Sequence, residues 1–281
     1  MEYAIQDVAQ IIGAKTNTLH DCTISILLTD SRRLSFPESS LFFALETKTN
    51  DGHRYIQDLY KLRVRNFVVS KMLPEFAQME EANFLLVKDV LAALQKLVAY
   101  HRKRFQIPVI GITGSNGKTV VKEFLYQLLH NEFDIVRSPR SYNSQIGVPL
   151  SVWEMNEKNT LGIFEAGISQ PDEMEKLQPI IAPTIGVLTS IGEAHQENFI
   201  SINQKCLEKL MLFNDSEAII YDGDNPLIST LIESACLSHK AIAWSRTDRE
   251  APLFIESIEK KQDETVIHCT LLGFDRTYTI P

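Results

Sequence analysis

The amino-acid sequence predicts an α/β fold with two domains, and three observations support this prediction. From Val109 onward, short apolar runs alternate with helical segments, as expected for strands of a parallel sheet buried on both faces; the runs are VIGIT, LGIFEAG, TIGVLTSIG, EAIIYDGDN and KAIAWS. A glycine-rich loop joins the first run to the helical segment KTVVKEFLYQLLH. The last stretch, LFIESIEKKQDETVIHCTLLGFDRTYTIP, predicts antiparallel strands joined by polar turns. Residues 107–281 should therefore form a doubly wound parallel core that ends in antiparallel strands.

Residues 1–106 predict a smaller domain of mixed α/β type. ISILLTDSRRL, SLFFALET, RNFVVS and NFLLVKD have the composition of strands, whereas YIQDLYKL and VLAALQKLVAYHRKRF have the period of amphipathic helices. Pro108 disfavours helical backbone just before it, so the helical pattern should end there. We therefore expect two domains, at 1–106 and 107–281.

Composition excludes several classes of function. A net charge of −8 and a pI near 5.4 argue against a nucleic-acid partner, which would require a broad basic face. No apolar run approaches the roughly 20 residues of a membrane span, and the N-terminus has no signal-peptide pattern. The four cysteines lack metal-ligand spacing and are expected to be buried free thiols. The sequence thus indicates a soluble, cytoplasmic protein without a membrane or nucleic-acid partner.

The segment VIGITGSNGKTVVKEF predicts a phosphate-binding loop of unusual spacing. In the common pattern GxxxxGK[ST], four residues separate the first glycine from the Gly-Lys pair, but here Gly111 lies too early and Gly114 too late. TGSNGKT nevertheless supplies glycines that let backbone amides turn inward, a lysine for phosphate oxygens and a threonine hydroxyl for Mg²⁺. The loop also leads into a helix N-terminus, which favours anions. The predicted nucleotide-binding residues are Gly114, Ser115, Asn116, Gly117, Lys118 and Thr119. The alternative is a glycine turn without a ligand.

Two further residues follow buried strands of the predicted core. Glu165 ends LGIFEAG, and His195 follows TIGVLTSIG. Because the carboxyl ends of parallel strands form the ligand crevice of an open α/β sheet, Glu165 and His195 could converge with Thr119 on a metal ion. Taken alone, each has a structural explanation, since a single histidine is more often part of the packing.

Two weaker patterns could also bear on function. Lys205 and Lys209 are four residues apart on a predicted helix, where a solvated face is the alternative; a lysine beside a metal site should be neutral or modified. In the first domain, TDSRR follows a strand and NDGHRY opens a helix. Ser31, Arg32 and the helix-start amides could bind a second anion such as a nucleotide diphosphate, although a turn and an N-cap would give the same pattern.

Together these motifs resemble the Mur ligases. TDSRR, LFFAL, DGHRY, GITGSNGKTVVKEF, SYNSQIGVPLS, FEAGISQPDEME and IGEAHQENF occur in the order and rough spacing of that family over nearly the whole chain. NSQIGVPLS resembles the branch that adds D-alanyl-D-alanine to a UDP-N-acetylmuramoyl tripeptide. The branch that adds the third peptide residue is the alternative within the family. Outside it, a folylpolyglutamate synthetase-like ligase and a non-catalytic nucleotide-binding module remain as rivals.

The resemblance implies an ATP-dependent and Mg²⁺-dependent amide ligase of peptidoglycan synthesis, in which the tripeptide carboxylate becomes an acyl phosphate that D-alanyl-D-alanine attacks. It implies that Lys118 holds the β- and γ-phosphates, that Thr119 and Glu165 ligate Mg²⁺, and that His195 holds a second Mg²⁺. It assigns substrate or γ-phosphate contact to Asn143 and adenine contact to Asp222 and Asn225. Ser31, Arg32, Asp51, Gly52 and His53 would form the uridine-diphosphate site. Lys209 lies at the spacing of a lysine that the family carbamylates, and Lys205 is the alternative.

The chain departs from the family pattern in three respects. Lys209 is followed by Leu210 and Met211 rather than by Gly-Glu, and DGDN replaces the usual Asn-Ala-Asp-Asp segment. The family also has a C-terminal domain that brings the amino acceptor, and no counterpart is present in the sequence. We therefore expect an N-terminal domain and an incomplete central domain of a longer parent chain, inactive in ligation by themselves. Some relatives are fused to another cell-wall enzyme such as an alanine racemase, so the parent could be too.

Overall fold

The computed structural model describes residues 1–16, 19–192 and 196–280. The chain forms two compact units. The first comprises Met1–Gln106 together with Gln145–Glu157, and the second comprises Ile107–Ser144 together with Lys158–Pro281. The predicted mixed α/β class with a parallel sheet is confirmed.

The first unit is built around a four-stranded parallel sheet in the order β3-β4-β5-β6. The strands are β3 (Ile26–Leu28), β4 (Ser40–Phe43), β5 (Asn66–Val69) and β6 (Asn83–Leu86). Its helices are α1 (Ile5–Ile12), α2 (Ile56–Lys61) and α3 (Val90–Arg102), with 3-10 turns η1 (Ser31–Arg33), η2 (Gly52–Tyr55) and η3 (Pro74–Gln78). β1 (Tyr3–Ala4) and β2 (Thr23–Ile24) form a separate antiparallel pair. Phe42, Phe67 and Leu59 are fully or almost fully buried in its core.

The segment Gln145–Glu157 packs in the first unit, which differs from the division expected at residue 106. Its helix α5 (Gly147–Trp153) lies against α3, where the Gln95 amide donates to the Gln145 carbonyl at 3.2 Å and side-chain oxygen at 2.9 Å. Val148 and Val152 are completely buried. α3 ends at Arg102, before Pro108, but this long-range packing decides where the later helix belongs.

The second unit contains a nine-stranded sheet in the order β15-β14-β13-β12-β11-β10-β7-β9-β8. Its strands are β7 (Val109–Thr113), β8 (Ile135–Arg137), β9 (Leu161–Glu165), β10 (Ile185–Leu188), β11 (Ala218–Asp222), β12 (Ala241–Ser245), β13 (Leu253–Lys260), β14 (Thr265–Leu271) and β15 (Phe274–Ile280). The strands from β7 to β13 pair in parallel, whereas β14 is antiparallel to both of its neighbours, β13 and β15. The change from parallel to antiparallel strands occurs where the sequence predicted it.

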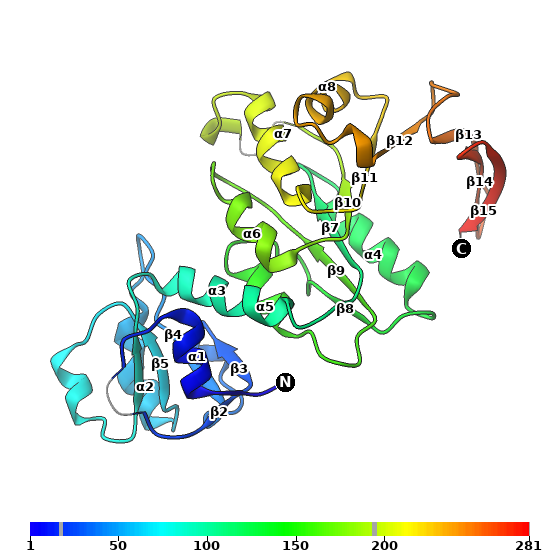
Figure 1. The fold of residues 1–281 in the computed structure, drawn as a ribbon. Helices are drawn as coiled ribbons and strands as arrows, with labels where there is room; N and C mark the ends of the chain where they lie inside the picture. The colour runs from blue at the N-terminus through cyan, green and yellow to red at the C-terminus, as the bar shows by residue number, and fades with distance from the viewer. Residues whose placement is uncertain (17–18, 193–195, 281) are drawn as a thin grey trace. The chain divides into compact units, whose positions relative to one another are not determined.

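Helices cover both faces of this sheet. They are α4 (Lys118–Leu129), α6 (Met174–Ile181), α7 (Ile202–Leu210) and α8 (Pro226–Ser234), with turns η4 (Gln196–Asn198), η5 (Met211–Phe213) and η6 (Ser238–Lys240). The strand order reverses at β7, so right-handed crossovers place α4 on one face and the other helices on the opposite face, as Figure 1 shows. The carboxyl ends of β7, β9 and β10 therefore border the switch point where ligands bind in such sheets.

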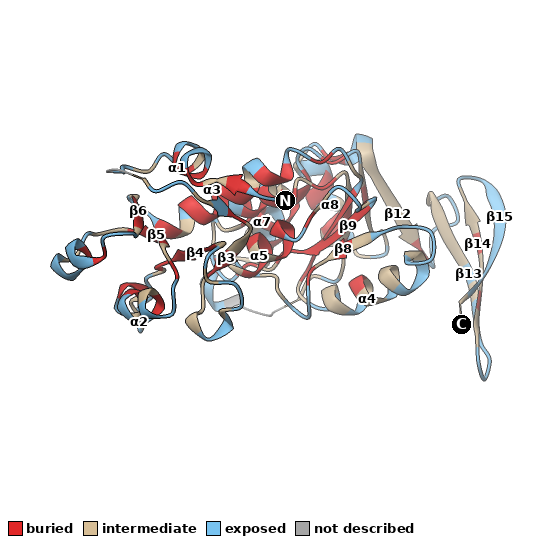
Figure 2. Cartoon of the chain, turned by 90° about the horizontal axis from the view of Figure 1, so that it is seen from below, coloured by how far each residue is buried: buried red, intermediate tan, exposed pale blue. Residues whose placement is uncertain are grey.

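Burial follows these layers (Figure 2). Ile112 and Ile163 of the central strands are completely buried, whereas α4 and the terminal antiparallel strands are mostly partly buried or exposed. None of the four cysteines forms a disulfide. Cys206 and Cys269 are buried as expected, but Cys22 is half-buried and Cys236 is exposed. Within the described residues, no helix is long and apolar enough to cross a membrane.

Candidate active site

The predicted phosphate loop lies between the end of β7 and the start of α4, at the switch point of the sheet. Gly114 has a φ of 145° and Gly117 a φ of 83°, conformations that favour glycine. Gly117 is the N-cap of α4 and offers no side-chain hydrogen bond to the first amides of the helix. These amides, with the positive end of the helix dipole, are suited to phosphate oxygens. The positive φ values account for glycine at both positions, and phosphate binding by this loop stays a prediction.

The segment that follows β10 braces the loop from one side. The Ser115 amide donates to the Ser190 carbonyl at 2.7 Å, and the Thr189 hydroxyl donates to the Asn116 carbonyl at 2.6 Å. The Ser115 hydroxyl donates to the Gly192 carbonyl at 3.0 Å and accepts from the Gly192 amide at 2.9 Å. These bonds fix the loop before any ligand binds.

Lys118 folds back over the loop. Its ammonium donates to the Gly114 carbonyl at 2.8 Å and approaches the Ser115 carbonyl at 3.4 Å. Burial lowers the pKa of Lys118, the negative charge of Glu165 opposes this shift, and the positive charge of Lys205 adds to it. A cation held at the loop by weak acceptors is well placed to exchange them for phosphate oxygens.

Thr119 and Glu165 meet at the start of α4. The Thr119 hydroxyl lies 2.9 Å from one carboxylate oxygen of Glu165 and 3.2 Å from the other. Glu165 is completely buried at the end of β9, and the Ser141 hydroxyl is a further neighbour of Thr119 at 3.2 Å. A carboxylate and a hydroxyl beside a phosphate loop form the all-oxygen donor set that Mg²⁺ prefers. The residues present therefore fit the metal that was expected here.

Two buried lysines of α7 differ in their environment. The Lys205 ammonium donates to the Gly192 carbonyl beside the loop. Lys209 is only 2% exposed, and among the described residues no hydrogen-bond acceptor or carboxylate pairs with it. Burial, followed by the positive charges of Lys118 and Lys205, lowers the pKa of Lys209 to about 7. A substantial part of Lys209 is thus a neutral amine near pH 7.

Asn143 lies close to the Glu165 end of β9. Its carbonyl accepts a hydrogen bond of 2.8 Å from the Gly167 amide, and a Cβ on Gly167 would stand 3.0 Å from the Asn143 side-chain oxygen. His195, the expected second metal ligand, lies outside the described residues. The structure thus brings Lys118, Thr119, Glu165 and Asn143 to one edge of the second unit.

Asp222 and Asn225 lie after β11, in a turn that their own side chains organise. Asp222 accepts from the Asp224 amide at 3.1 Å. Asn225 is the N-cap of α8 and accepts from the Leu227 amide at 3.1 Å. The predicted adenine contact is not tested by this geometry, since the Asn225 oxygen already caps a helix.

In the first unit, the TDSRR and NDGHRY turns follow β3 and β4. These are neighbouring parallel strands, so both turns lie at the same edge of the small sheet. Ser31 opens η1, and Arg32 makes two hydrogen bonds of 2.9 and 2.7 Å to the Asp30 carboxylate. The Arg32 bonds hold the pKa of Asp30 at about 2. The Arg32 side chain is 87% exposed, which leaves its outer edge open to a ligand.

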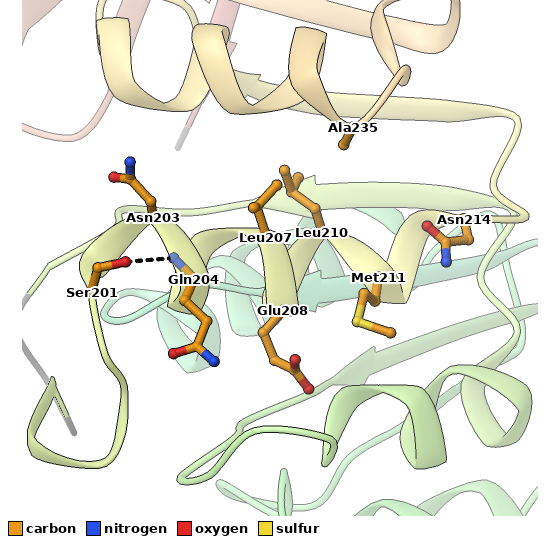
Figure 3. A pocket seen from close by; sticks show the side chains of 9 residues that line it. All are labelled: Ser201, Asn203, Gln204, Leu207, Glu208, Leu210, Met211, Asn214 and Ala235. Atoms are coloured by element: carbon orange, nitrogen blue, oxygen red, sulfur yellow. Dashed lines mark hydrogen bonds between the residues drawn. The ribbon is translucent and has the colours of Figure 1, made fainter.

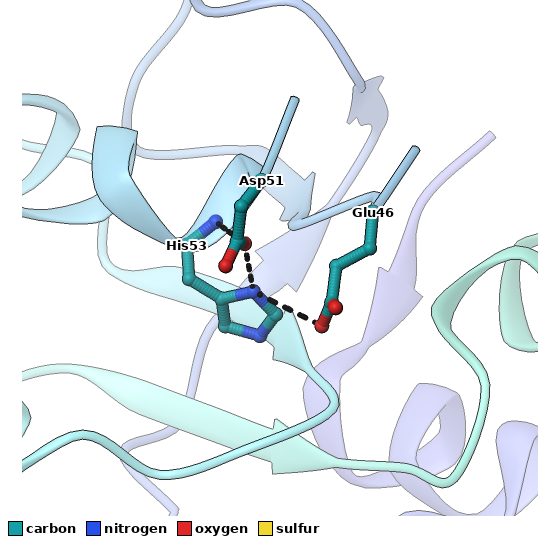
Figure 4. Close-up of side chains that lie close together, drawn as sticks. All are labelled: Glu46, Asp51 and His53. Atoms are coloured by element: carbon teal, nitrogen blue, oxygen red, sulfur yellow. Dashed lines mark hydrogen bonds and ion pairs between the residues drawn. The ribbon is translucent and has the colours of Figure 1, made fainter. Parts of the chain in front are cut away.

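Figure 4 shows Asp51 and His53 beside Glu46, a group that could suggest a metal site. The ring nitrogen Nδ1 of His53 lies 2.7 Å from Asp51, and Nε2 accepts the Ser70 amide hydrogen at 3.1 Å. Because a backbone amide can only donate, the neutral ring carries its hydrogen on Nδ1 and has no lone pair for a metal. Asp51 also pairs with Lys71 at 2.7 Å, which lowers its pKa. The cluster therefore stabilises a turn.

Close backbone packing explains why position 52 in this turn is a glycine. A Cβ at this position would lie 2.7 Å from the Ala44 carbonyl carbon and 2.8 Å from the Leu45 nitrogen. Backbone atoms at such distances cannot move aside cheaply. The side chains of Asp51 and His53 are thus committed to the fold, and a ligand at this turn would meet its backbone and the neighbouring residues.

The comparisons with known proteins bear on this arrangement. A family model described as the Mur ligase middle domain matches residues 112–280, which is more than half of the chain. The chain belongs to the Mur ligase family. Among its curated relatives, the UDP-N-acetylmuramoyl-tripeptide--D-alanyl-D-alanine ligase of Bacillus subtilis (strain 168) is 27% identical over 99% of this chain and 59% of the relative. The Mur ligase chain thus spans about three fifths of that relative's length.

Solved Mur ligases have the same fold. The crystal structure of MurF from Acinetobacter baumannii superimposes with a TM-score of 0.88 at 22% identity, over 100% of this chain and 61% of that one. MurF ligase from Thermotoga maritima in complex with ADP gives a TM-score of 0.76 at 21% identity, over 90% of this chain and 57% of that one. At these identities the likeness establishes the fold of this Mur ligase chain.

A surface cavity of about 510 Å³ lies along α7 of this Mur ligase chain, as Figure 3 shows. Leu207, Glu208 and Met211 are among its lining residues, but Lys205 and Lys209 are not. The Glu208 carboxylate accepts from the Met174 amide at 3.4 Å. The cavity therefore lies on a different side of α7 from the two site lysines.

Sequence reasoning missed Lys122 and Ser138, which contact Glu165, and Ser141, which contacts Thr119. Lys122 pairs with Glu165 at 2.9 Å, and the Glu165 amide donates to the Ser138 hydroxyl at 3.3 Å. The only available signal was the position of Lys122 four residues after Lys118, on the same side of the helix. In isolation that spacing equally predicts a solvated face.

Proposed function

We propose that this Mur ligase acts as an ATP-dependent amide-bond ligase of peptidoglycan precursor synthesis, joining D-alanyl-D-alanine to a UDP-N-acetylmuramoyl tripeptide. The observation that carries the proposal is the meeting of Lys118, Thr119 and Glu165 at an open helix N-terminus. The names of its relatives support the choice of substrates. The chain spans 59% of the Bacillus relative, so the proposal concerns the full-length protein.

The reaction begins with a carboxylate, which is a poor acyl donor. Its oxygen attacks the γ-phosphorus of ATP, ADP leaves, and an acyl phosphate forms. The amine of D-alanyl-D-alanine then attacks the carbonyl carbon, phosphate leaves, and the amine loses a proton. Lys118 stabilises the charge that develops on the transferred phosphoryl group, and the α4 amides hold the other phosphate oxygens.

Thr119 and Glu165 would hold Mg²⁺, which supplies positive charge beside the phosphates. The position of Glu165 suits this function, because its Oε2 oxygen lies 2.9 Å from the Thr119 hydroxyl. His195 is proposed as a ligand of a second Mg²⁺, and Asn143 as a contact to the γ-phosphate or the substrate. Asp222 and Asn225 are proposed to border the adenine.

Lys209 is the better of the two candidates for carbamylation. Carbamylation requires a neutral amine that attacks CO₂, forms an N–C bond and releases a proton. Lys209 has a pKa of about 7 and no hydrogen-bond acceptor among the residues described, whereas Lys205 is bound to the Gly192 carbonyl. The carbamate would place a negative charge among Lys118, Lys205 and the metal, relieving the repulsion that now acts on Lys209.

The first unit is proposed to bind the uridine diphosphate through Ser31, Arg32 and the turn at Asp51, Gly52 and His53. The Ser31 hydroxyl, which opens the turn η1, and the exposed edge of Arg32 are proposed to contact phosphate. Because the Asp51 and His53 side chains are engaged in the turn, its contribution would come through backbone shape. The reaction is assigned to the cytoplasm, in keeping with four cysteines that form no disulfide.

The decisive experiment is a product-forming assay on the full-length protein that contains this sequence. Product and phosphate should form only when ATP, the UDP-tripeptide and D-alanyl-D-alanine are all present. Product from the UDP-dipeptide with a diamino acid would instead identify the third-residue ligase. Extension of a folate would establish the folylpolyglutamate synthetase-like alternative. Nucleotide binding without turnover of any of these pairs would favour a non-catalytic module.

A further inference from the structure

Lys122 is the only buried residue of α4. It is 0% exposed, although lysine is among the side chains least often buried. On the same helix, Val120 and Phe124 are 58% and 54% exposed. A helix that leaves apolar side chains in solvent and buries an ammonium group requires a specific explanation.

The explanation lies in the three acceptors around the ammonium group. Lys122 donates to the Ser138 carbonyl at 2.8 Å, to the Arg140 carbonyl, and to Oε1 of Glu165 at 2.9 Å. An ammonium has three hydrogens, so the donor capacity is fully used. The partially exposed Glu123 carboxylate lies farther away, at 3.4 Å. Lys122 thus connects α4, the turn after β8 and the end of β9.

The two oxygens of Glu165 consequently differ. Lys122 holds Oε1, while Oε2 is the oxygen closer to the Thr119 hydroxyl, at 2.9 Å against 3.2 Å. We propose that Lys122 is a positioning residue that makes Glu165 a one-oxygen ligand and thereby favours Mg²⁺ over Ca²⁺ in the nucleotide site. This inference rests on the proposed function. Ca²⁺ often takes both oxygens of a carboxylate, whereas Mg²⁺ requires compact octahedral geometry.

Lys122 also holds the turn that borders the metal site. Arg140 has a φ of 51°, a left-handed conformation that is uncommon for a residue with a side chain. Its carbonyl is one of the acceptors of Lys122. The next residue, Ser141, lies 3.2 Å from the Thr119 hydroxyl. The same lysine therefore orients Glu165 and the segment that faces Thr119.

The test compares nucleotide binding with two metals in the full-length protein. Affinity for a non-hydrolysable ATP analogue is measured by calorimetry in Mg²⁺ and in Ca²⁺, for the wild type and for Lys122→Met. The variant keeps an unbranched side chain that is one atom shorter, and it removes the charge and the donors. We expect the Mg²⁺-to-Ca²⁺ affinity ratio to fall by about tenfold or more, because partners that orient metal ligands typically contribute that much.

Glu123→Gln is the matched control. It changes a neighbour of Lys122 that does not contact Glu165 in the structure, and it should leave the ratio unchanged. If Lys122→Met does not fold by circular dichroism, Lys122→Gln is measured in its place, since its amide retains hydrogen-bond donors without the charge. The same fall in the ratio is expected for this variant.

The outcomes separate this inference from the function on which it rests. Failure of the wild type to bind the analogue with either metal would overturn the proposed nucleotide site itself. Binding by the wild type with an unchanged ratio in the Lys122 variant would overturn the positioning function alone. An equal loss of nucleotide affinity with both metals would show that Lys122 only stabilises the fold, and it would also overturn the positioning function.

Discussion

The hydroxyl of Thr119 lies 2.9 Å from Oε2 of Glu165, joining the first turn of α4 to the last residue of β9. The two residues are 46 positions apart in the chain. β7 lies between β10 and β9 in the sheet, so the loop that follows it emerges directly beside Glu165. The site is therefore a consequence of strand order, which brings the phosphate loop to a buried carboxylate.

Replacement of Lys118 with alanine should remove ATP-dependent turnover from the full-length protein. The ammonium is the cation held at the loop, and loss of one charge-stabilising donor typically lowers kcat by about 100-fold to 1,000-fold. Phosphate release in the presence of all substrates measures the effect. Lys176→Ala, at an exposed position on α6, is the control and should retain full activity. Undiminished turnover in Lys118→Ala would contradict the phosphate-loop assignment.

Carbamylation should occur at Lys209 and depend on pH. With the pKa of Lys209 lowered to about 7, the reactive neutral amine increases as pH rises through 7. In protein supplied with ¹³C-bicarbonate, we expect a carbamate resonance that is stronger at pH 8 than at pH 6. Lys209→Gln should lack this resonance and Lys205→Gln should retain it. The reverse pattern would assign the modification to Lys205.

The fold was largely predictable because its signals are local. The buried strands are continuous apolar runs, and the glycines of the loop adopt positive φ values that few other residues tolerate. Gln145–Glu157 shows the limit of local reasoning. Nothing near Pro108 indicates that a helix 40 residues later packs against α3, because Val148 and Val152 are buried by distant side chains.

The site was predictable only in part for the same reason. Lys118, Thr119 and Glu165 have recognisable positions relative to a loop and a strand end. Lys122 could not be distinguished from a solvated lysine, since its burial depends on two carbonyls of the turn after β8. The choice between Lys205 and Lys209 likewise required knowledge of which ammonium has an acceptor.

Gly114→Ala should destroy the phosphate loop. A Cβ at this position would lie 1.9 Å from the Thr189 hydroxyl oxygen and 3.0 Å from the Ser190 carbonyl oxygen, at a φ of 145°. We expect nucleotide affinity to fall at least about tenfold, in line with a strained backbone costing 1–3 kcal/mol. Gly192→Ala is the control, because the nearest described atom to its Cβ would be the Asn116 side-chain nitrogen at 3.6 Å. Calorimetric titration with ADP and Mg²⁺ distinguishes the two variants, and equal affinities would refute this description of the loop.

His101 should make the first unit sensitive to acid. It is 1% exposed, its Nε2 donates to the Met155 carbonyl at 3.1 Å, and its Nδ1 accepts from the Tyr3 hydroxyl at 2.8 Å. Burial lowers the pKa of His101 to about 4, although the Met155 hydrogen bond opposes the shift. The folded state therefore resists protonation that the unfolded chain accepts near pH 6.5.

The stabilising contribution of His101 is thus fully present above pH 6.5 and is lost as pH falls toward 4. The difference between the pKa values of His101 in the folded and unfolded states corresponds to a loss of about 3 kcal/mol in the free energy of unfolding. Urea unfolding between pH 7.5 and 4.5 measures it, with His101→Gln as the comparison. The variant should be less stable at pH 7.5 because it loses packing and a hydrogen bond, but its stability should decline less steeply with acid. Parallel pH profiles for the two proteins would show that His101 is not the titrating group, since the slope of stability with pH counts protons taken up on unfolding.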